Sequence, residues 1–212
     1  MFGDNHHGTD GKPGSVGQRL RELIEEVKLM DELGLDFFGI GEHHRPDYAV
    51  SVPEILLAAA ATVTKNIKLG SAVNVLSSSD PVRIYQSFAM IDQLTNGRAE
   101  LVAGRGSFIE SFPLYGYKLE DYDELFDEKL HLLHQINTEN PINWKGKHRA
   151  ALRDQEILPR AVNDHLDLWV AVGGTPESVI RAGKLGLPVI FAIIGGKYHR
   201  QSQYTGSDHT FR

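Results

Sequence analysis

The segment Gly41-Glu42-His43-His44-Arg45-Pro46-Asp47-Tyr48 follows directly on the apolar run Phe37-Phe38-Gly39-Ile40. Such a run is typical of a buried strand, so two adjacent imidazoles and a carboxylate stand where that strand ends. In an eight-stranded α/β barrel the loops after the strands form the reaction face. A lone buried histidine is more often a core residue, but burying Glu-His-His-Arg costs too much free energy without partners or a purpose. The pattern favours an active site in a parallel α/β protein.

The composition is that of a globular protein with one sizeable core. The chain has 212 residues, 41% hydrophobic and 24% charged, which makes a single domain the default. Its formal net charge of -6 argues against nucleic acid or an anionic membrane as the main partner. The sequence contains no cysteine, which excludes disulfides, iron–sulfur clusters and cysteine nucleophiles. No apolar stretch reaches membrane-spanning length, and we expect a cytoplasmic protein.

Helix and strand patterns alternate along the chain. The expected helices run from the Ser15 cap to Gly34, Pro53 to Thr64, Asp80-Pro81 to Asn96-Gly97, Glu120 to Ile136, and Pro176 to Leu185. The expected strands run from Asp36 to Gly41, Ile67 to Leu76, Ala99 to Gly104, Leu168 to Val172, and Val189 to Ile194, with a short turn or hairpin at Trp144 to Lys147. Strands that alternate with helices indicate parallel βαβ units.

These units are too few for a closed (β/α)8 TIM barrel, which needs eight strands and eight helices in roughly 250 residues. Met1-Phe2-Gly3-Asp4 resembles the end of a strand whose beginning is absent, and apolar periodicity is lost from Gly195 onward. We therefore expect an incomplete barrel that lacks its first strand and its C-terminal βα units. Residues 1–196 would form the partial barrel domain, and residues 197–212 a disordered polar tail.

Three ordered blocks carry a family resemblance. They are Leu35 to His44, then Leu69-Gly70-Ser71-Ala72-Val73 through Asp80-Pro81-Val82-Arg83, and then Gly97 to Gly106. At this spacing they resemble the bacterial luciferase-like flavin monooxygenases, including alkanal monooxygenase, and the resemblance runs from about Phe2 to Gly196. It implies a barrel that binds reduced FMN, activates dioxygen at the flavin and oxidises a small organic substrate. It also implies a separate flavin reductase that supplies the reduced flavin.

The resemblance implies a phosphate site as well. Arg105, Gly174, Thr175 and Ser178 fall on the family's positions for the FMN phosphate. The residue types agree with this role, because the segment from Val172 to Ser178 follows a strand and opens a helix, where backbone N–H groups and the helix dipole attract anions. The planar Arg105 cation suits bidentate phosphate contact. Taken alone, Gly-Gly-Thr-Pro could also be an ordinary strand-to-helix turn.

Two further roles follow from the resemblance. It places a non-proline cis peptide between Ala72 and Val73, beneath the isoalloxazine ring, and it aligns His43 with the family's catalytic histidine. An imidazole titrates near neutral pH, so His43 could act as a general acid or base near the flavin or the substrate. The neighbouring His44 is expected to be structural.

Alternatives remain open from the sequence. The chain could be an active or formerly active monooxygenase, a non-catalytic flavin-binding protein of the same fold, or a metal-dependent hydrolase. Glu42, His43 and His44 offer metal-binding groups, but neighbours on an extended strand point to opposite faces, so we expect no metal there. A deazaflavin could replace FMN, because a phosphate site does not distinguish the two.

The remaining features bear on packing and assembly. Phe108, Phe112, Tyr115 and Tyr117 could line a substrate cavity or pack their loop, and the acidic residues from Asp121 to Glu128 are expected to be a solvated helix start. The alanines from Ala58 to Ala61 permit close helix packing, within the monomer or in a homodimer. Open sheet edges expose unpaired backbone groups, so we expect a homo-oligomer in which another copy covers the gap.

Overall fold

The computed structural model describes residues 14–106, 108–173 and 175–192. One parallel sheet runs through the molecule in the order β1-β2-β4-β7-β8, and β3 pairs with β4 beyond the end of β2. The strands are β1 (Phe37–Ile40), β2 (Lys68–Ser71), β3 (Asn74–Val75), β4 (Ala99–Gly104), β7 (Asp167–Val172) and β8 (Val189–Phe191). Because every pairing in this sheet is parallel, the carboxyl ends of its strands all lie at one edge.

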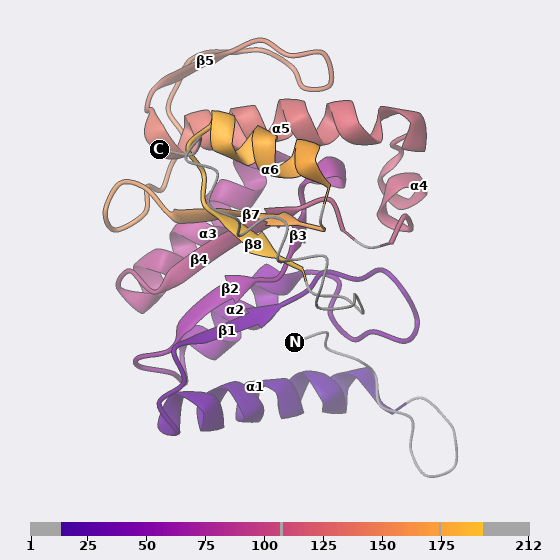
Figure 1. Cartoon of the computed structure of the whole chain (residues 1–212). Helices are drawn as coiled ribbons and strands as arrows, with labels where there is room; N and C mark the ends of the chain where they lie inside the picture. Colours follow the sequence, from indigo (N-terminus) through magenta and orange to yellow (C-terminus); the bar gives the residue numbers. More distant parts are fainter. Residues whose placement is uncertain (1–13, 107, 174, 193–212) are drawn as a thin grey trace.

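Helices connect these strands, as the alternating pattern predicts. The main ones are α1 (Val16–Glu32), α2 (Pro53–Ala61), α3 (Pro81–Thr95), α5 (Tyr122–Thr138) and α6 (Pro176–Lys184). Three short elements are η1 (Leu76–Ser78), α4 (Ser111–Tyr115) and η2 (Leu119–Asp121). Figure 1 shows α1 at one end of the sheet and α5 and α6 at the other. This parallel half-barrel confirms the incomplete (β/α)8 fold expected from the sequence.

Local side-chain caps explain where two helices begin and end. The Ser15 hydroxyl accepts the Gln18 N–H at 3.4 Å at the start of α1. The Asp80 carboxylate accepts the N–H groups of Val82 and Arg83 at 2.9 and 3.2 Å at the start of α3. Asn96, with a φ of 55°, closes α3 in the left-handed conformation. These contacts join residues close in sequence, which is why the pattern predicts them well.

The core lies where the strands meet the inward faces of the helices. Phe38, Leu69 and Leu101 come from the sheet, and Leu57 and Phe88 come from α2 and α3; each is at most 1% exposed. Burying a large apolar side chain stabilises the fold by about 1.5–3 kcal/mol. Within the described ranges, no helix combines the length and apolar character that crossing a bilayer requires.

The structure differs from the expected elements in several places. The strand expected from Ile67 to Leu76 is interrupted, because β2 ends at Ser71 and β3 begins only at Asn74. The Ala72-Val73 peptide between them is cis, which confirms the geometry that the family resemblance implies. The hairpin expected at Trp144 to Lys147 is longer, and its strands are β5 (Ile142–Trp144) and β6 (Leu152–Gln155). The expected strand end at Met1 to Asp4 and the tail at 197–212 lie outside the described residues.

A buried ammonium joins α5 to η1. Lys129 is 2% exposed, and its Nζ donates to the Ser77 carbonyl at 2.6 Å and lies 4.0 Å from the centroid of the Tyr117 ring. Burial lowers the pKa of Lys129 to about 8, although the nearby carboxylates of Asp80 and Glu128 act in the opposite direction.

Replacing Lys129 with methionine should remove a pH-dependent part of the stability. The Lys129 pKa is about 8 in the folded protein and about 10.4 in an unfolded chain, so the unfolded state binds more protons between these values. The contribution of Lys129 to the unfolding free energy should therefore rise by about 1–3 kcal/mol from pH 8 to 10.5, and Lys129→Met should lose that contribution relative to the control. Urea unfolding across this range measures it, with the exposed Lys118→Met as control. An equal change of the unfolding free energy with pH in Lys129→Met and Lys118→Met would contradict the assignment.

Candidate active site

The residues singled out in the sequence gather at the carboxyl edge of the sheet. His43 follows β1, Ala72-Val73 follows β2, Arg105 follows β4, and Thr175 and Ser178 follow β7. These strands are neighbours, because β1 pairs with β2, β2 with β4, and β4 with β7. Gly174 lies outside the described residues.

Arg105 and Ser178 meet at the start of α6. The Arg105 Nη2 donates to the Ser178 Oγ at 3.1 Å, and the Ser178 Oγ lies 2.8 Å from the Thr175 Oγ1. Ser178 is 5% exposed. The other arm of the guanidinium donates to the Asp123 carboxylate at 2.7 Å. One cation and two hydroxyls at a helix N-terminus form a donor set that suits a phosphate group.

The cis peptide lies between the His43 loop and the end of β4. The Ala72 N–H donates to the Ile40 carbonyl at 2.7 Å, and the Val73 carbonyl accepts the Glu42 N–H at 3.2 Å. Glycine is required opposite it, because a Cβ at Gly104 would lie 2.6 Å from the Val73 side chain. This close approach holds the Ala72-Val73 segment against β4.

The His43 ring turns back toward this peptide. A Cβ at Gly41 would lie 3.0 Å from His43 Nε2 and 3.1 Å from the Ala72 carbonyl oxygen, so the imidazole and that carbonyl approach the same point. The ring centroid of His43 is 4.1 Å from that of Tyr48 and 5.3 Å from that of Phe108. His43 is 8% exposed. An imidazole is thus held beside the cis peptide in an aromatic environment.

His44 has a different role from His43. Its Nε2 lies 2.8 Å from Glu42 Oε1, and both side chains are nearly buried. The second Glu42 oxygen accepts the Val75 N–H at 2.8 Å. The pair therefore ties the β1 loop to β3, in agreement with the structural role expected for His44.

The metal interpretation of Glu42, His43 and His44 has no support from this geometry. Glu42 and His44 bind each other, whereas His43 packs on aromatic rings. Among the residues placed by the structure, the metal-competent groups that gather are Asp121, Glu124 and His148, at the start of α5. There the Lys147 ammonium already lies 2.6 Å from the Glu124 carboxylate.

The aromatic residues after Arg105 divide into two groups. Phe108 faces His43, and Tyr115 lies 5.4 Å from His44, centroid to centroid. Phe112 is fully buried, and Tyr117 packs on Lys129. The segment therefore packs on the rest of the protein through Phe112 and Tyr117, and Phe108 contributes one ring beside His43.

Sequence reasoning missed three contributors. Tyr48 and Arg45 lie inside the segment from Gly41 to Tyr48, where an aromatic ring and a cation after a histidine pair were the available signal. Asp123 was expected to be solvated, but it binds Arg105. The acidic helix start is not simply a solvated face, since Glu128 also accepts backbone N–H groups of Lys147 and His148.

The fold is that of a barrel-type α/β protein whose sheet carries His43, Arg105 and Ser178 at its carboxyl edge. The chain matches the family described as luciferase-like monooxygenase over residues 1–203, and it belongs to that family.

Three known proteins illustrate the relationship. N-acetyl-S-alkylcysteine monooxygenase of Bacillus subtilis (strain 168) is 31% identical over 187 residues, which are 86% of this chain and 53% of that protein. Monooxygenase RslO1 from Streptomyces bottropensis superposes with a TM-score of 0.81 at 25% identity, covering 89% of this chain and 58% of that one.

The third is the oxygenating constituent of 3,6-diketocamphane monooxygenase from Pseudomonas putida, a type II Baeyer-Villiger enzyme in complex with FMN. Its TM-score is 0.72 at 23% identity, covering 84% of this chain and 53% of that one, and this similarity shows the fold alone. This chain spans about half the length of the proteins it matches.

Proposed function

We propose that this chain binds FMN and takes part in the monooxygenation of a small organic substrate with reduced FMN and dioxygen. The observation that carries the proposal is the joining of Arg105 to Ser178 at 3.1 Å, on the sheet edge where His43 and the cis Ala72-Val73 peptide also lie. Family membership supports the same chemistry. A cytoplasmic location and a separate flavin reductase stay predictions.

The residues present fit a flavin phosphate. Arg105, Thr175 and Ser178 would hold it, because a guanidinium and two hydroxyls there lie within hydrogen-bond distance of one another. Ala72 and Val73 would support the ring system. When bound, reduced flavin supplies the two electrons with which one oxygen atom enters the substrate and the other leaves as water.

The chain's own side chains would divide the remaining work. Arg105 neutralises the phosphate, and Asp123 must share or release the guanidinium when it binds. His43 Nε2 or Nδ1 holds or moves a proton at the reacting groups. Tyr48 and Phe108 shield that imidazole from water.

A second candidate is a flavin-binding protein of the same fold without turnover. About half of each matched protein has no counterpart in this chain. Flavin binding at the Arg105 site does not by itself require turnover, so the two properties are tested separately.

Flavin titration followed by oxygen consumption separates these candidates. The protein is titrated with FMN, riboflavin and a phosphate-bearing deazaflavin, and is then supplied with enzymatically reduced FMN and an N-acetyl-S-alkylcysteine. Stoichiometric FMN binding with substrate-dependent oxygen uptake supports the monooxygenase. Binding without turnover of this or other thioether and ketone substrates supports the second candidate. Tighter deazaflavin binding would reassign the cofactor, and failure of every flavin to bind would reject both candidates.

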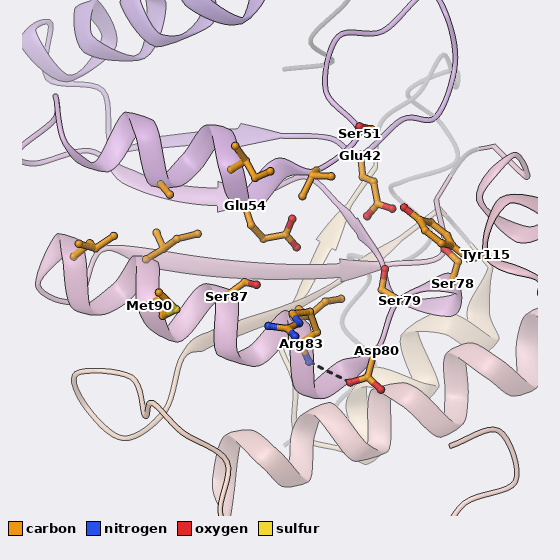
Figure 2. Close-up of a pocket in the computed structure, with 16 residues that line it drawn as sticks. Glu42, Ser51, Glu54, Ser78, Ser79, Asp80, Arg83, Ser87, Met90 and Tyr115 are labelled. Carbon is orange, nitrogen blue, oxygen red and sulfur yellow. Dashed lines mark hydrogen bonds between the residues drawn. The ribbon is translucent and has the colours of Figure 1, made fainter. Parts of the chain in front are cut away.

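A groove on the outer surface is the basis for a proposed homodimer. It has a volume of about 520 Å³ and lies between α2 and α3 (Figure 2). Ile55 and Leu94 line it and are 71% and 62% exposed. Arg83 lies on the same face as Glu54 and Asp80, so two copies related by a two-fold axis can pair opposite charges around an apolar centre.

Packing within the monomer accounts for part of the alanine run. Ala60 and Ala61 belong to the buried core, whereas Ala58 lines the groove. Burial, together with the nearby Glu42 carboxylate, raises the pKa of Glu54. Covering the groove would remove Glu54 further from water, so a partner surface there must supply a cation or leave the carboxyl protonated.

Replacing Leu94 with glutamate should dissociate this dimer. A charge at the apolar centre would have to be desolvated without a partner, which costs several kcal/mol in the interface. Sedimentation velocity should show a dimer for the wild type and a monomer for Leu94→Glu. The control is Leu33→Glu, since Leu33 is 68% exposed at the end of α1. A monomeric wild-type chain, or a dimer that survives Leu94→Glu, would contradict the interface.

A further inference from the structure

The loop after β1 and the segment after β4 are joined by one arginine. Arg45 Nε donates to Asp47 Oδ1 at 2.9 Å, and its Nη1 donates to Glu110 Oε1 at 3.2 Å. The carbon of its guanidinium lies 4.7 Å from the centroid of Phe108. Arg45 therefore holds Phe108 by a cation–π contact. It also binds one carboxylate from the loop after β1, that of Asp47, and one from the segment after β4, that of Glu110.

Phe108 packs on the site and not on the core. Its ring centroid is 5.3 Å from His43 and 5.9 Å from Tyr48. It is half-buried and lies outside the buried apolar cluster, whereas Phe112, four residues later, is fully buried. A phenyl ring placed on a polar imidazole gains less from burial than a core ring does, which favours a role toward a ligand.

The charges around Arg45 set the character of this region. One guanidinium faces the carboxylates of Asp47 and Glu110, so the cation has no unpaired charge to attract an anionic ligand. The hydrogen bond from Arg45 lowers the pKa of Asp47, which stays ionised at neutral pH. The aromatic rings that pack on His43 in this region are those of Tyr48 and Phe108.

We infer that Tyr48 and Phe108 form the wall that receives the apolar part of the substrate beside His43, and that Arg45 is the positioning residue that holds Phe108 in this wall. This inference rests on the proposed function for its substrate. It names the substrate class as an organic molecule that presents an alkyl or planar apolar group to the histidine.

The first experiment tests the positioning role without any ligand. Amide hydrogen exchange in residues 108–112 should be faster in Arg45→Met than in the wild type, and intermediate in Arg45→Lys, which keeps the charge but loses the planar fork. Arg153→Met, on the hairpin strand β6, is the matched control and should exchange like the wild type. Unchanged exchange in Arg45→Met would overturn the positioning role.

The second experiment tests the wall. Binding of N-acetyl-S-alkylcysteines with alkyl groups from ethyl to hexyl is measured by calorimetry on the FMN-loaded protein, so no turnover is needed. Each added methylene should tighten binding about fourfold in the wild type, which corresponds to about 0.8 kcal/mol. Phe108→Ala should make this series nearly flat, and Arg45→Met should reduce its slope.

The outcomes distinguish the two proposals. An equal slope in the wild type and Phe108→Ala, or a flat series in a wild type that binds FMN, would reject the wall. A wild type that binds no FMN would reject the proposed function and with it the substrate assignment, while hydrogen exchange would still decide the role of Arg45.

Discussion

Replacing Arg105 with alanine should abolish the preference of this protein for FMN over riboflavin and weaken FMN binding by more than tenfold. The two flavins differ by the phosphate, and Arg105 is the charged group that reaches Ser178 at the start of α6. A hydrogen bond to a charged group contributes about 1.5–3 kcal/mol, or roughly tenfold to more than a hundredfold in affinity. Flavin fluorescence titration at fixed ionic strength measures both dissociation constants.

A second variant makes this test sharper. Asp123 binds Arg105 at 2.7 Å, and its side chain is 71% exposed, so it competes with a phosphate without being buried. Asp123→Asn should therefore strengthen FMN binding severalfold and leave riboflavin binding unchanged. Asp127→Asn, whose partner is Arg181, is the matched control. Equal affinities of the wild type for FMN and riboflavin would reject the phosphate site.

Replacing His43 with alanine should reduce flavin-dependent oxygenation by about 10²–10⁴-fold, the usual contribution of a positioned acid or base. Thermal stability should change little, because the ring packs on the half-buried rings of Tyr48 and Phe108 at the edge of the sheet. Oxygen uptake per folded molecule and the melting temperature are measured together. A much lower melting temperature with unaltered turnover would show that His43 is a core histidine.

His44→Ala provides the contrasting case. This change leaves one Glu42 carboxylate oxygen buried without its 2.8 Å partner, and losing a buried hydrogen-bond partner costs about 1–3 kcal/mol. We expect a large fall in melting temperature and a smaller effect on turnover per folded molecule. If His43→Ala instead lowered the melting temperature and His44→Ala instead lowered turnover per folded molecule, His44 would be the catalytic residue and His43 the structural one.

Neighbouring histidines therefore differ because of what each side chain meets. His43 packs on aromatic rings at the carboxyl edge of the sheet. His44 pairs with Glu42, whose second oxygen accepts the Val75 N–H. The sequence places both at the end of a strand but does not decide between them. The period-2 alternation of a strand states only that they point to opposite sides.

The strand expected from Ile67 to Leu76 shows where sequence patterns fail. Its apolar residues have the right propensity throughout, yet β2 ends at Ser71 and the cis peptide follows. Propensity describes the preference of each residue for a backbone region, and it carries no information about a peptide bond imposed by neighbouring chain segments. The family resemblance implied the cis bond, which the local residue preferences do not.

The sequence by itself determined the order of strands and helices, the caps of α1 and α3, and the position of His43 and Arg105 at strand ends. These properties depend on periodicity and on hydrogen bonds between residues a few positions apart. The family resemblance grouped Arg105 with Ser178, 73 residues later, but only the tertiary structure gave their direct contact and decided that Asp123 and Arg45 join the site. Such contacts depend on parallel register and side-chain direction, which are fixed when β4 packs beside β7 and cannot be read from either segment alone.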